Sequence, residues 1–121
     1  MATESIVKIE LWNRKYKDDF VRLNRDWITK YFNIEEHDIE IFANPEEIIL
    51  SGGEIFFATI NDFVVGCCAL VYHKDKNMYE LAKMAVDSQF QGSGIGYQLG
   101  ITLLNYAKKH GIKSIFGSVE I

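Results

Sequence analysis

The chain has 121 residues, of which 48% are hydrophobic, and its 17 acidic against 13 basic residues give a formal net charge of -4. These values are typical of one globular domain, residues 1–121, with a single core. Lys and Arg form no stripe that would favour nucleic acid, and no apolar run approaches the roughly 20 residues that cross a bilayer. The amino terminus lacks the basic and apolar regions of a signal peptide. We therefore expect a cytoplasmic protein that engages neither nucleic acid nor a membrane.

The first half of the chain predicts one strand and two helices. Residues 5–12 alternate between apolar and polar, as a half-buried strand does. Over residues 15–32, apolar side chains recur every three or four positions and predict one helix face, made of Tyr16, Phe20, Leu23, Trp27 and Tyr31. The acid-rich segment 33–44 has no clear period and is interpreted as a loop. An Asn-Pro-Glu-Glu start at 44–47 predicts a second helix, which Gly52-Gly53 ends.

The second half predicts three consecutive strands over 54–60, 63–73 and 78–86, joined by short polar turns. A glycine-rich segment then leads into a helix over about 94–110 and a closing strand in 112–121. The predicted order is β-α-α-β-β-β-α-β, and its last two strands should be parallel because a helix joins them. We therefore expect an α+β fold: a mixed, mostly antiparallel sheet with helices on both faces.

Two adjacent cysteines, Cys67 and Cys68, lie in the apolar run FVVGCCALVY and are predicted to be buried structural thiols. No further cysteine is available for a disulfide framework or a Cys-rich metal site. The spacing of His, Asp and Glu does not suggest a metal ligand set either, so no metal is expected.

The segment QFQGSGIG (89–96) places Gly92, Gly94 and Gly96 directly before a helix. A glycine-rich turn of this kind directs several backbone N–H groups to one point, where the helix N-terminus adds positive potential, so it suits a phosphate. No Gly-Lys-Ser/Thr follows, which excludes a Walker-A loop, and G-x-G-x-G differs from the dinucleotide G-x-G-x-x-G. A phosphate cradle and a ligand-free turn both remain open from these residues.

The spacing Gln91-x-x-Gly94-x-Gly96 resembles the Q/R-x-x-G-x-G/A signature of the GNAT superfamily of acetyl-CoA-dependent N-acetyltransferases. The surrounding YELAKMAVDSQFQGSGIG is similar to the strand-loop-helix of that family, and GGEIFFATINDFVVGCCAL to its central hairpin. The predicted element order matches the family over essentially the whole chain. The resemblance implies a GNAT-like acyl-CoA N-acyltransferase fold.

The resemblance also implies how coenzyme A would bind. The pyrophosphate would be cradled by the backbone N–H groups of Gln91, Gly92, Ser93, Gly94, Ile95 and Gly96. The Gln91 side chain and the Ser93 hydroxyl could add hydrogen bonds. The pantetheine arm would pair with the strand end Met84-Ala85-Val86, and a backbone N–H there, at Val86, would polarise the thioester carbonyl.

Members of the family usually catalyse direct attack of a primary amine on the acetyl thioester, which requires a group that takes a proton. Glu80 is the first candidate for this base. Strict alternation places it on an apolar face with Met84 and Val86, and burial on such a face raises the pKa of a carboxyl group. The alternative is a solvated Glu80 or one in an ion pair with Lys74 or Lys83.

Other candidate bases are Glu54, at the head of a strand, and Glu120, near the end of the chain. His73 follows a strand and is interpreted as a turn residue rather than a base. His110 suits a helix C-terminus, where a cation is favoured.

The family continues beyond its fifth strand with a helix and two strands, which carry an Asn that contacts coenzyme A and a Tyr that protonates the thiolate. This sequence has no counterpart of either, so we expect a C-terminally truncated domain. It is interpreted as a fragment, or as a chain whose exposed fifth strand is covered by a homodimer partner or a separate protein.

The predicted function is an N-acetyltransferase that moves an acetyl group from acetyl-CoA to a primary amine of a small molecule or protein. A non-catalytic coenzyme-A-binding or regulatory module, or an inactive fragment, is the alternative. The acceptor cannot be identified from the residues. In the family, the loop that here contains His37 and Asp38 often forms the acceptor wall, and a solvated loop is the competing interpretation.

Overall fold

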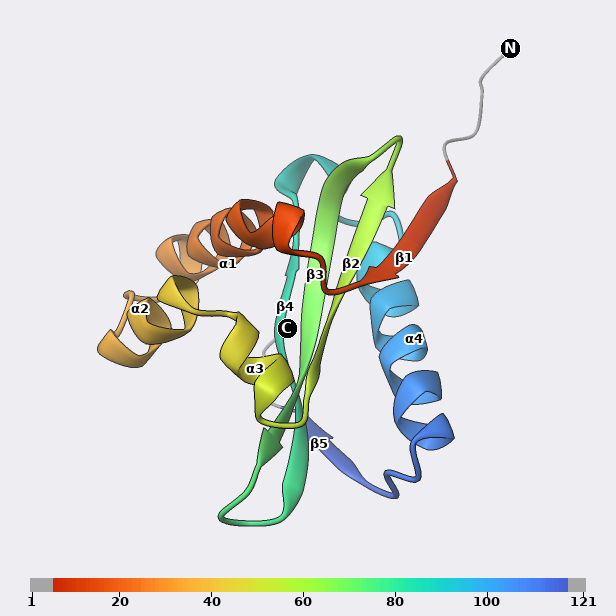
Figure 1. Ribbon diagram of the computed structural model, residues 1–121. Coiled ribbons are helices and arrows are strands. Elements are labelled where there is room, and N and C mark those ends of the chain that lie inside the picture. The colour runs from red at the N-terminus through yellow and green to blue at the C-terminus, as the bar shows by residue number, and fades with distance from the viewer. Residues whose placement is uncertain (1–5, 118–121) are drawn as a thin grey trace.

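A computed structural model describes residues 6–117, which form a five-stranded sheet with helices on both faces (Figure 1). In chain order the elements are β1 (Val7–Leu11), η1 (Arg14–Tyr16), α1 (Lys17–Tyr31), α2 (Glu36–Ala43), α3 (Glu46–Leu50), β2 (Glu54–Ile60), β3 (Phe63–His73), β4 (Met78–Val86), η2 (Ser88–Phe90), α4 (Ile95–Lys109) and β5 (Ile115–Gly117). The strands lie in the order β1-β2-β3-β4-β5; all neighbours are antiparallel except β4 and β5, which are parallel. The predicted α+β fold class is confirmed.

Segment 33–44, predicted as a loop, contains the additional helix α2. Its first turn is stabilised by Asp38, whose Oδ2 accepts a hydrogen bond of 3.0 Å from the Glu35 N–H. Phe42, only 5% exposed, anchors the helix to the rest of the domain. Eight residues make barely two turns, too few for an apolar period to stand out from an irregular segment. Three helices therefore connect β1 to β2, where two were predicted.

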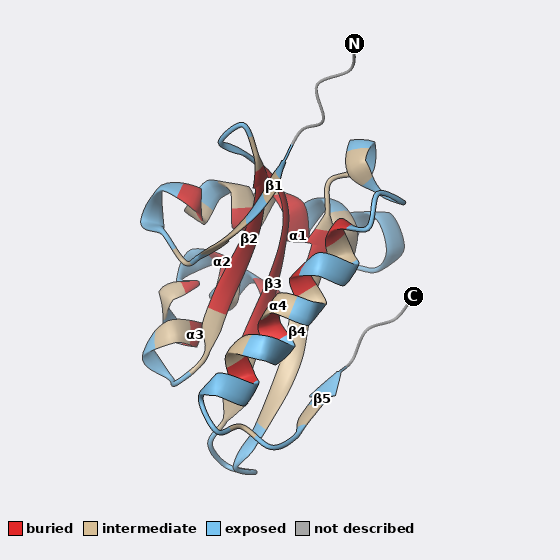
Figure 2. Ribbon diagram, turned by 90° about the vertical axis from the view of Figure 1, so that its right-hand side faces the viewer, coloured by how far each residue is buried: buried red, intermediate tan, exposed pale blue. Residues whose placement is uncertain are grey.

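The core lies on both faces of β2 and β3, whose central residues are buried (Figure 2). One cluster packs beneath α1 and α3, and the other beneath α4. The predicted burial of Cys67 and Cys68 is confirmed, with one thiol in each cluster. Burial raises the pKa of Cys67 to about 12, so this thiol stays protonated.

Helix α4 lies unusually close to the sheet where it crosses Gly66 of β3. A Cβ atom at Gly66 would lie 3.0 Å from Ile95 Cγ2 and 3.1 Å from Leu99 Cδ1, closer than side chains normally pack. The missing side chain therefore lets the first turns of α4 rest directly on β3. This contact fixes the N-terminus of α4 beside the end of β4.

Strand β4 contains a β-bulge at Lys83. Ala82 pairs with Ala69 and Ala85 with Cys67, so three steps along β4 oppose two along β3. Lys83 itself has a φ of 54°, in the left-handed region that side chains other than glycine rarely adopt. Such strain is found preferentially at functional sites.

The bulge changes which face the end of β4 presents. Leu81, Met84 and Val86 all pack against the core beneath α4. In a regular strand Leu81 would lie on the opposite face from the other two, because it is an odd number of residues from each. Glu80 alternates with Leu81 and so lies on the opposite face, toward α1. The prediction that Glu80 shares an apolar face with Met84 and Val86 is therefore wrong, because strict alternation fails at the bulge.

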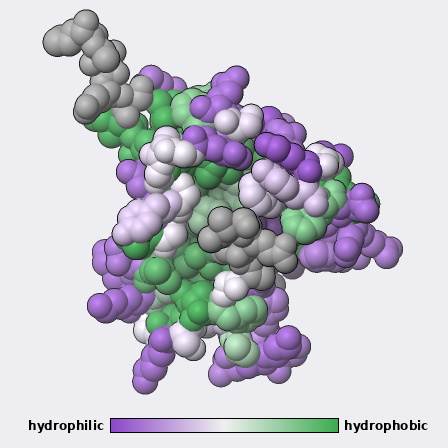
Figure 3. Space-filling view, turned by 180° about the vertical axis from the view of Figure 1, so that it is seen from behind, coloured by the Kyte–Doolittle hydropathy of each residue, from purple (hydrophilic) through white to green (hydrophobic). Residues whose placement is uncertain are grey.

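The last two strands of the sheet pair over a short stretch. β5 pairs with β4 where Ile115–Gly117, at the end of the described residues, oppose Tyr79–Leu81. Within the described residues, the outer edge of β4 is thus unpaired with β5 after Leu81. Apolar residues gather over the middle of the rear face of the molecule, with hydrophilic ones around its margin (Figure 3). Coverage of β5 by a partner stays a prediction.

Candidate functional site

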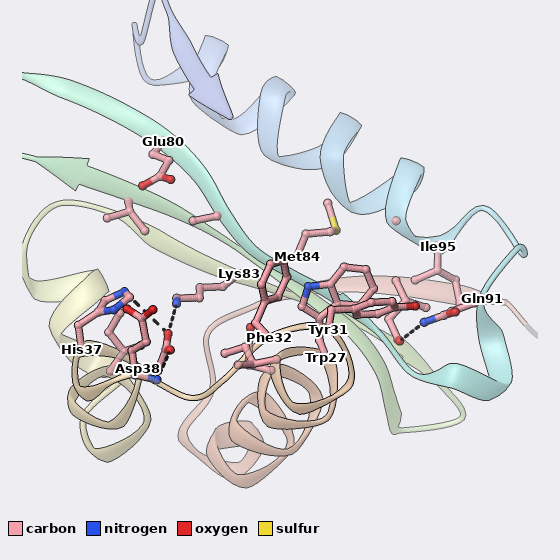
Figure 4. Close-up of a pocket in the computed structure, with 18 of the residues that line it drawn as sticks. Trp27, Tyr31, Phe32, His37, Asp38, Glu80, Lys83, Met84, Gln91 and Ile95 are labelled. Carbon is pink, nitrogen blue, oxygen red and sulfur yellow. Dashed lines mark hydrogen bonds and ion pairs between the residues drawn. The ribbon is translucent and has the colours of Figure 1, made fainter. Parts of the chain in front are cut away.

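A cleft of about 930 Å³ lies between α1, α2, the edge of β4 and the N-terminus of α4. Figure 4 shows its two ends: the Lys83–Asp38 pair toward one side, and Gln91 and Ile95 toward the other. The glycine loop thus opens into the same space as the end of β4. The two ends are built from different kinds of groups.

The glycine-loop end of the cleft is formed by backbone. Gly92 and Gly94 have φ angles of 81° and 84°, a conformation that glycine adopts without the strain other residues incur. The first intrahelical hydrogen bond of α4 runs from Gln98 N–H to Gly94 O at 3.0 Å. The N–H groups of Ile95 and Gly96 precede it and so have no acceptor within the helix. Together with the helix dipole, they form an anion-binding geometry.

Two side chains hold the loop in this shape. The Gln91 amide Nε2 donates to the Val86 carbonyl at 3.4 Å, and the Ser93 hydroxyl donates to the Phe90 carbonyl. Ser93 and Ala85 do not line the cleft, whereas the other predicted cofactor-binding residues do. Contacts of the Gln91 and Ser93 side chains with a pyrophosphate stay predictions.

The backbone of Val86 faces the open edge of β4. The next N–H along the chain, that of Asp87, donates to Val65 O of β3 at 2.8 Å. Because successive residues of an extended strand direct their N–H groups to opposite edges, the Val86 N–H points away from β3. Its carbonyl does the same, as the bond from Gln91 confirms. The role of the Val86 N–H as donor to a thioester carbonyl stays a prediction.

Glu80, the predicted base, lines the cleft together with His73. The distance from Glu80 Oε1 to His73 Nε2 is 2.7 Å, and the two side chains are 16% and 34% exposed. They come from neighbouring strands and meet because the register pairs His73 with Met78 and Val71 with Glu80. His73, interpreted from the sequence as a turn residue, therefore belongs to the site.

The rival bases lie elsewhere. Glu54 accepts a hydrogen bond from the Ile55 N–H at 3.0 Å and does not line the cleft. His110 is at the end of α4, with its Nδ1 2.8 Å from Tyr106 O. Glu120 lies outside the described residues. Glu80 is thus the predicted base that the structure places in the cleft.

An ion pair connects α2 to β4 across the cleft. The Lys83 ammonium lies 3.1 Å from Asp38 Oδ1, and the two side chains are 15% and 8% exposed. Burial acts to raise the pKa of Asp38, but the Glu35 N–H and the Lys83 charge outweigh it and hold the pKa below its usual value. His37 lies farther from the same oxygen, at 3.8 Å. Asp38 is therefore ionised, and both residues suggested for the acceptor wall line the cleft.

The aromatic face of α1 extends beyond the core into the cleft. Phe20 and Leu23 are buried, as predicted, but Trp27 and Tyr31 line the cleft instead. Their ring centroids are 4.5 Å apart, and Tyr31 and the following Phe32 are each 50% exposed. The sequence pattern identified this face correctly but could not show where the core beneath it ends.

Among residues 6–117, no group of three or more His, Cys, Asp or Glu side chains is placed to hold a metal ion. Within the same range, none of the helices has the length and apolar character needed to traverse a bilayer. The cellular compartment stays a prediction.

A cleft along β4 of a mixed sheet, with a glycine loop and a helix N-terminus at one end, defines a domain that can hold an elongated phosphate-bearing ligand. The description of the family that it matches is "Acetyltransferase (GNAT) family", and the match covers residues 12–120. The chain belongs to this family.

The chain is also similar to solved structures and to part of a curated protein. A GNAT-family acetyltransferase from Staphylococcus aureus superposes with a TM-score of 0.81 at 26% identity, over 94% of this chain and 74% of that one. A predicted acetyltransferase with acetyl-CoA from Clostridium acetobutylicum shares the fold, with a TM-score of 0.77 at 14% identity over 95% and 82% of the two chains. N-acetylaspartate synthetase of rat is 36% identical over 64 residues, which are 53% of this chain. The match spans only 21% of the length of the synthetase.

Proposed function

We propose that this chain transfers the acetyl group of acetyl-CoA to a primary amine by direct attack. The observation that carries this proposal is a single cleft with the N–H groups of the glycine loop at one end and the Glu80–His73 pair toward the other, joined by the open edge of β4. The related fold of a protein solved with acetyl-CoA supports this choice of donor.

The residues at the loop fit coenzyme A. The N–H groups of segment 91–96 would bind its pyrophosphate, and the backbone of Met84-Ala85-Val86 would pair with the pantetheine arm along the unpaired edge. Acetyl-CoA would supply an acetyl group activated as a thioester. A backbone N–H of this strand end that points away from β3 would donate to the thioester carbonyl oxygen, where negative charge develops during attack.

Glu80 would take the proton from the attacking amine, and His73 would hold the carboxylate in place. The neutral amine nitrogen forms its bond to the acetyl carbon and then loses its remaining excess proton to solvent, the bond from that carbon to sulfur breaks, and the thiolate takes a proton from solvent. Removing the amine proton matters because a free primary amine is mostly protonated at neutral pH and cannot attack in that form.

The test is amine-dependent release of free thiol from acetyl-CoA, followed with a thiol reagent over a panel of primary amines. Cys67 and Cys68 are buried and burial raises the pKa of both, so the folded protein should add little signal. Tight coenzyme A binding without amine-dependent release would instead indicate a non-catalytic module. Absence of thermal stabilisation by coenzyme A at any concentration would indicate a domain that does not bind it.

A further inference from the structure

The acceptor end of the cleft holds more carboxylates than lysines and arginines. Of the described residues that line the cleft, three are carboxylates, namely Glu35, Asp38 and Glu80, while the lysines and arginines contribute only Lys83. Lys83 already forms an ion pair, because its ammonium lies 3.1 Å from Asp38 Oδ1 and both side chains are largely buried. A carboxylate entering this end would meet like charges and a lysine that Asp38 has neutralised.

The wall of the cleft between this end and the glycine loop is lined by aromatic rings. Tyr31 and Phe32 are half exposed, and Trp27 packs against Tyr31 on the same wall. In Figure 4 these rings lie between the Lys83–Asp38 pair and the glycine loop. Aromatic faces attract cations and favour burial of apolar groups, so this wall is suited to a ligand with both features.

We infer that the acceptor is a cationic primary amine carried on an aromatic or other apolar group, without a carboxylate beside the amine. The carboxylates attract the ammonium form and Glu80 removes its proton, while the rings of α1 cover the apolar part. Asp38 acts as a specificity-determining residue, since it neutralises the lysine that could otherwise bind an acidic acceptor. This inference rests on the proposed acetyl transfer.

A matched pair of acceptors tests the effect of the carboxylate alone, because 2-phenylethylamine and L-phenylalanine differ by one carboxylate next to the amine. The kcat/KM of each would be measured by thiol release, and the binding of each to the coenzyme-A-loaded protein by calorimetry. We expect the wild-type chain to prefer 2-phenylethylamine by about tenfold or more in both measurements. L-aspartate, with a second carboxylate, should be a still poorer ligand.

Two single substitutions should move this preference in opposite directions. Asp38→Asn removes the charge that faces Lys83 while keeping an oxygen for the Glu35 N–H, and should shift the ratio of the two kcat/KM values about tenfold toward L-phenylalanine. Lys83→Gln leaves Asp38 without its cation and should shift the ratio toward 2-phenylethylamine. Glu40→Gln, on the exposed side of α2 and away from the cleft, is the matched control and should leave the ratio unchanged.

General damage to the cleft would lower the rates with both acceptors and could not produce opposite shifts. Wild-type protein that acetylates L-phenylalanine or L-aspartate as well as 2-phenylethylamine would overturn the inference and leave the proposed function intact. If no amine supports thiol release, the proposed function fails, and calorimetry still decides the charge preference. In that case, binding of L-phenylalanine that is as tight as that of 2-phenylethylamine, or tighter, would refute the inferred charge preference.

Discussion

The two ends of the cleft achieve their geometry by different means. The glycine-loop end is formed by consecutive residues, mainly through backbone N–H groups fixed by the φ angles of Gly92 and Gly94. The acceptor end is assembled from side chains of α1, α2, β3 and β4, held by the His73–Glu80 and Lys83–Asp38 contacts. Substitutions at the first end should therefore change binding of the donor, and those at the second should change rate and acceptor choice.

The largest expected effect is at the acceptor end. Glu80→Gln keeps the size of the side chain but removes the group that accepts the amine proton, so kcat should fall by about 10²-fold or more. Binding of acetyl-CoA, measured by calorimetry, should stay close to that of the wild type. Glu54→Gln is the control, because Glu54 is outside the cleft, and its kcat should remain unchanged. A loss of only a few-fold in Glu80→Gln would move the role of base to water.

Gly94→Val, at the glycine-loop end, should weaken binding of the donor. A β-branched residue is strained at a φ of 84° and would distort the start of α4, weakening coenzyme A binding by about tenfold or more. Gly100→Ala is a matched control within α4, where nothing lies within 4 Å of the added Cβ. That change should stabilise the helix by about 0.5–1 kcal/mol and leave affinity unaltered. Equal affinity of Gly94→Val and wild type would show that backbone geometry does not set donor binding.

A smaller effect should appear in the pH dependence of stability. The pKa of Asp38 in the folded chain lies below its usual value of 3.8, so the stabilisation that its charge gives is present above that pH and is lost as the pH falls through the folded pKa. The difference in Tm between the wild type and Asp38→Asn should be constant at neutral to mildly acidic pH and shrink below about pH 4. A difference unaffected by acid would mean that packing, not charge, links α2 to β4.

The fold was largely predictable because its signals are local. Apolar runs separated by short polar turns marked β2, β3 and β4 with their observed bounds, and the helix over about 94–110 agrees with α4 within a residue at each end. The short helix α2 was missed, since it has little periodicity of its own and depends on Asp38 and on burial of Phe42. The bulge at Lys83 was also invisible, because the pairing of two strands, not the residues of one, creates it.

The sequence by itself determined the family and the position of the glycine loop, since a backbone cradle is encoded by neighbouring residues whose conformational preferences act locally. Only the tertiary structure decided that His73 meets Glu80, that Lys83 is neutralised by Asp38, and that the aromatic face of α1 continues into the cleft. These contacts join residues that are far apart in the chain or that meet only through strand register. Their distances, and hence their electrostatics, are set by packing that no local pattern records.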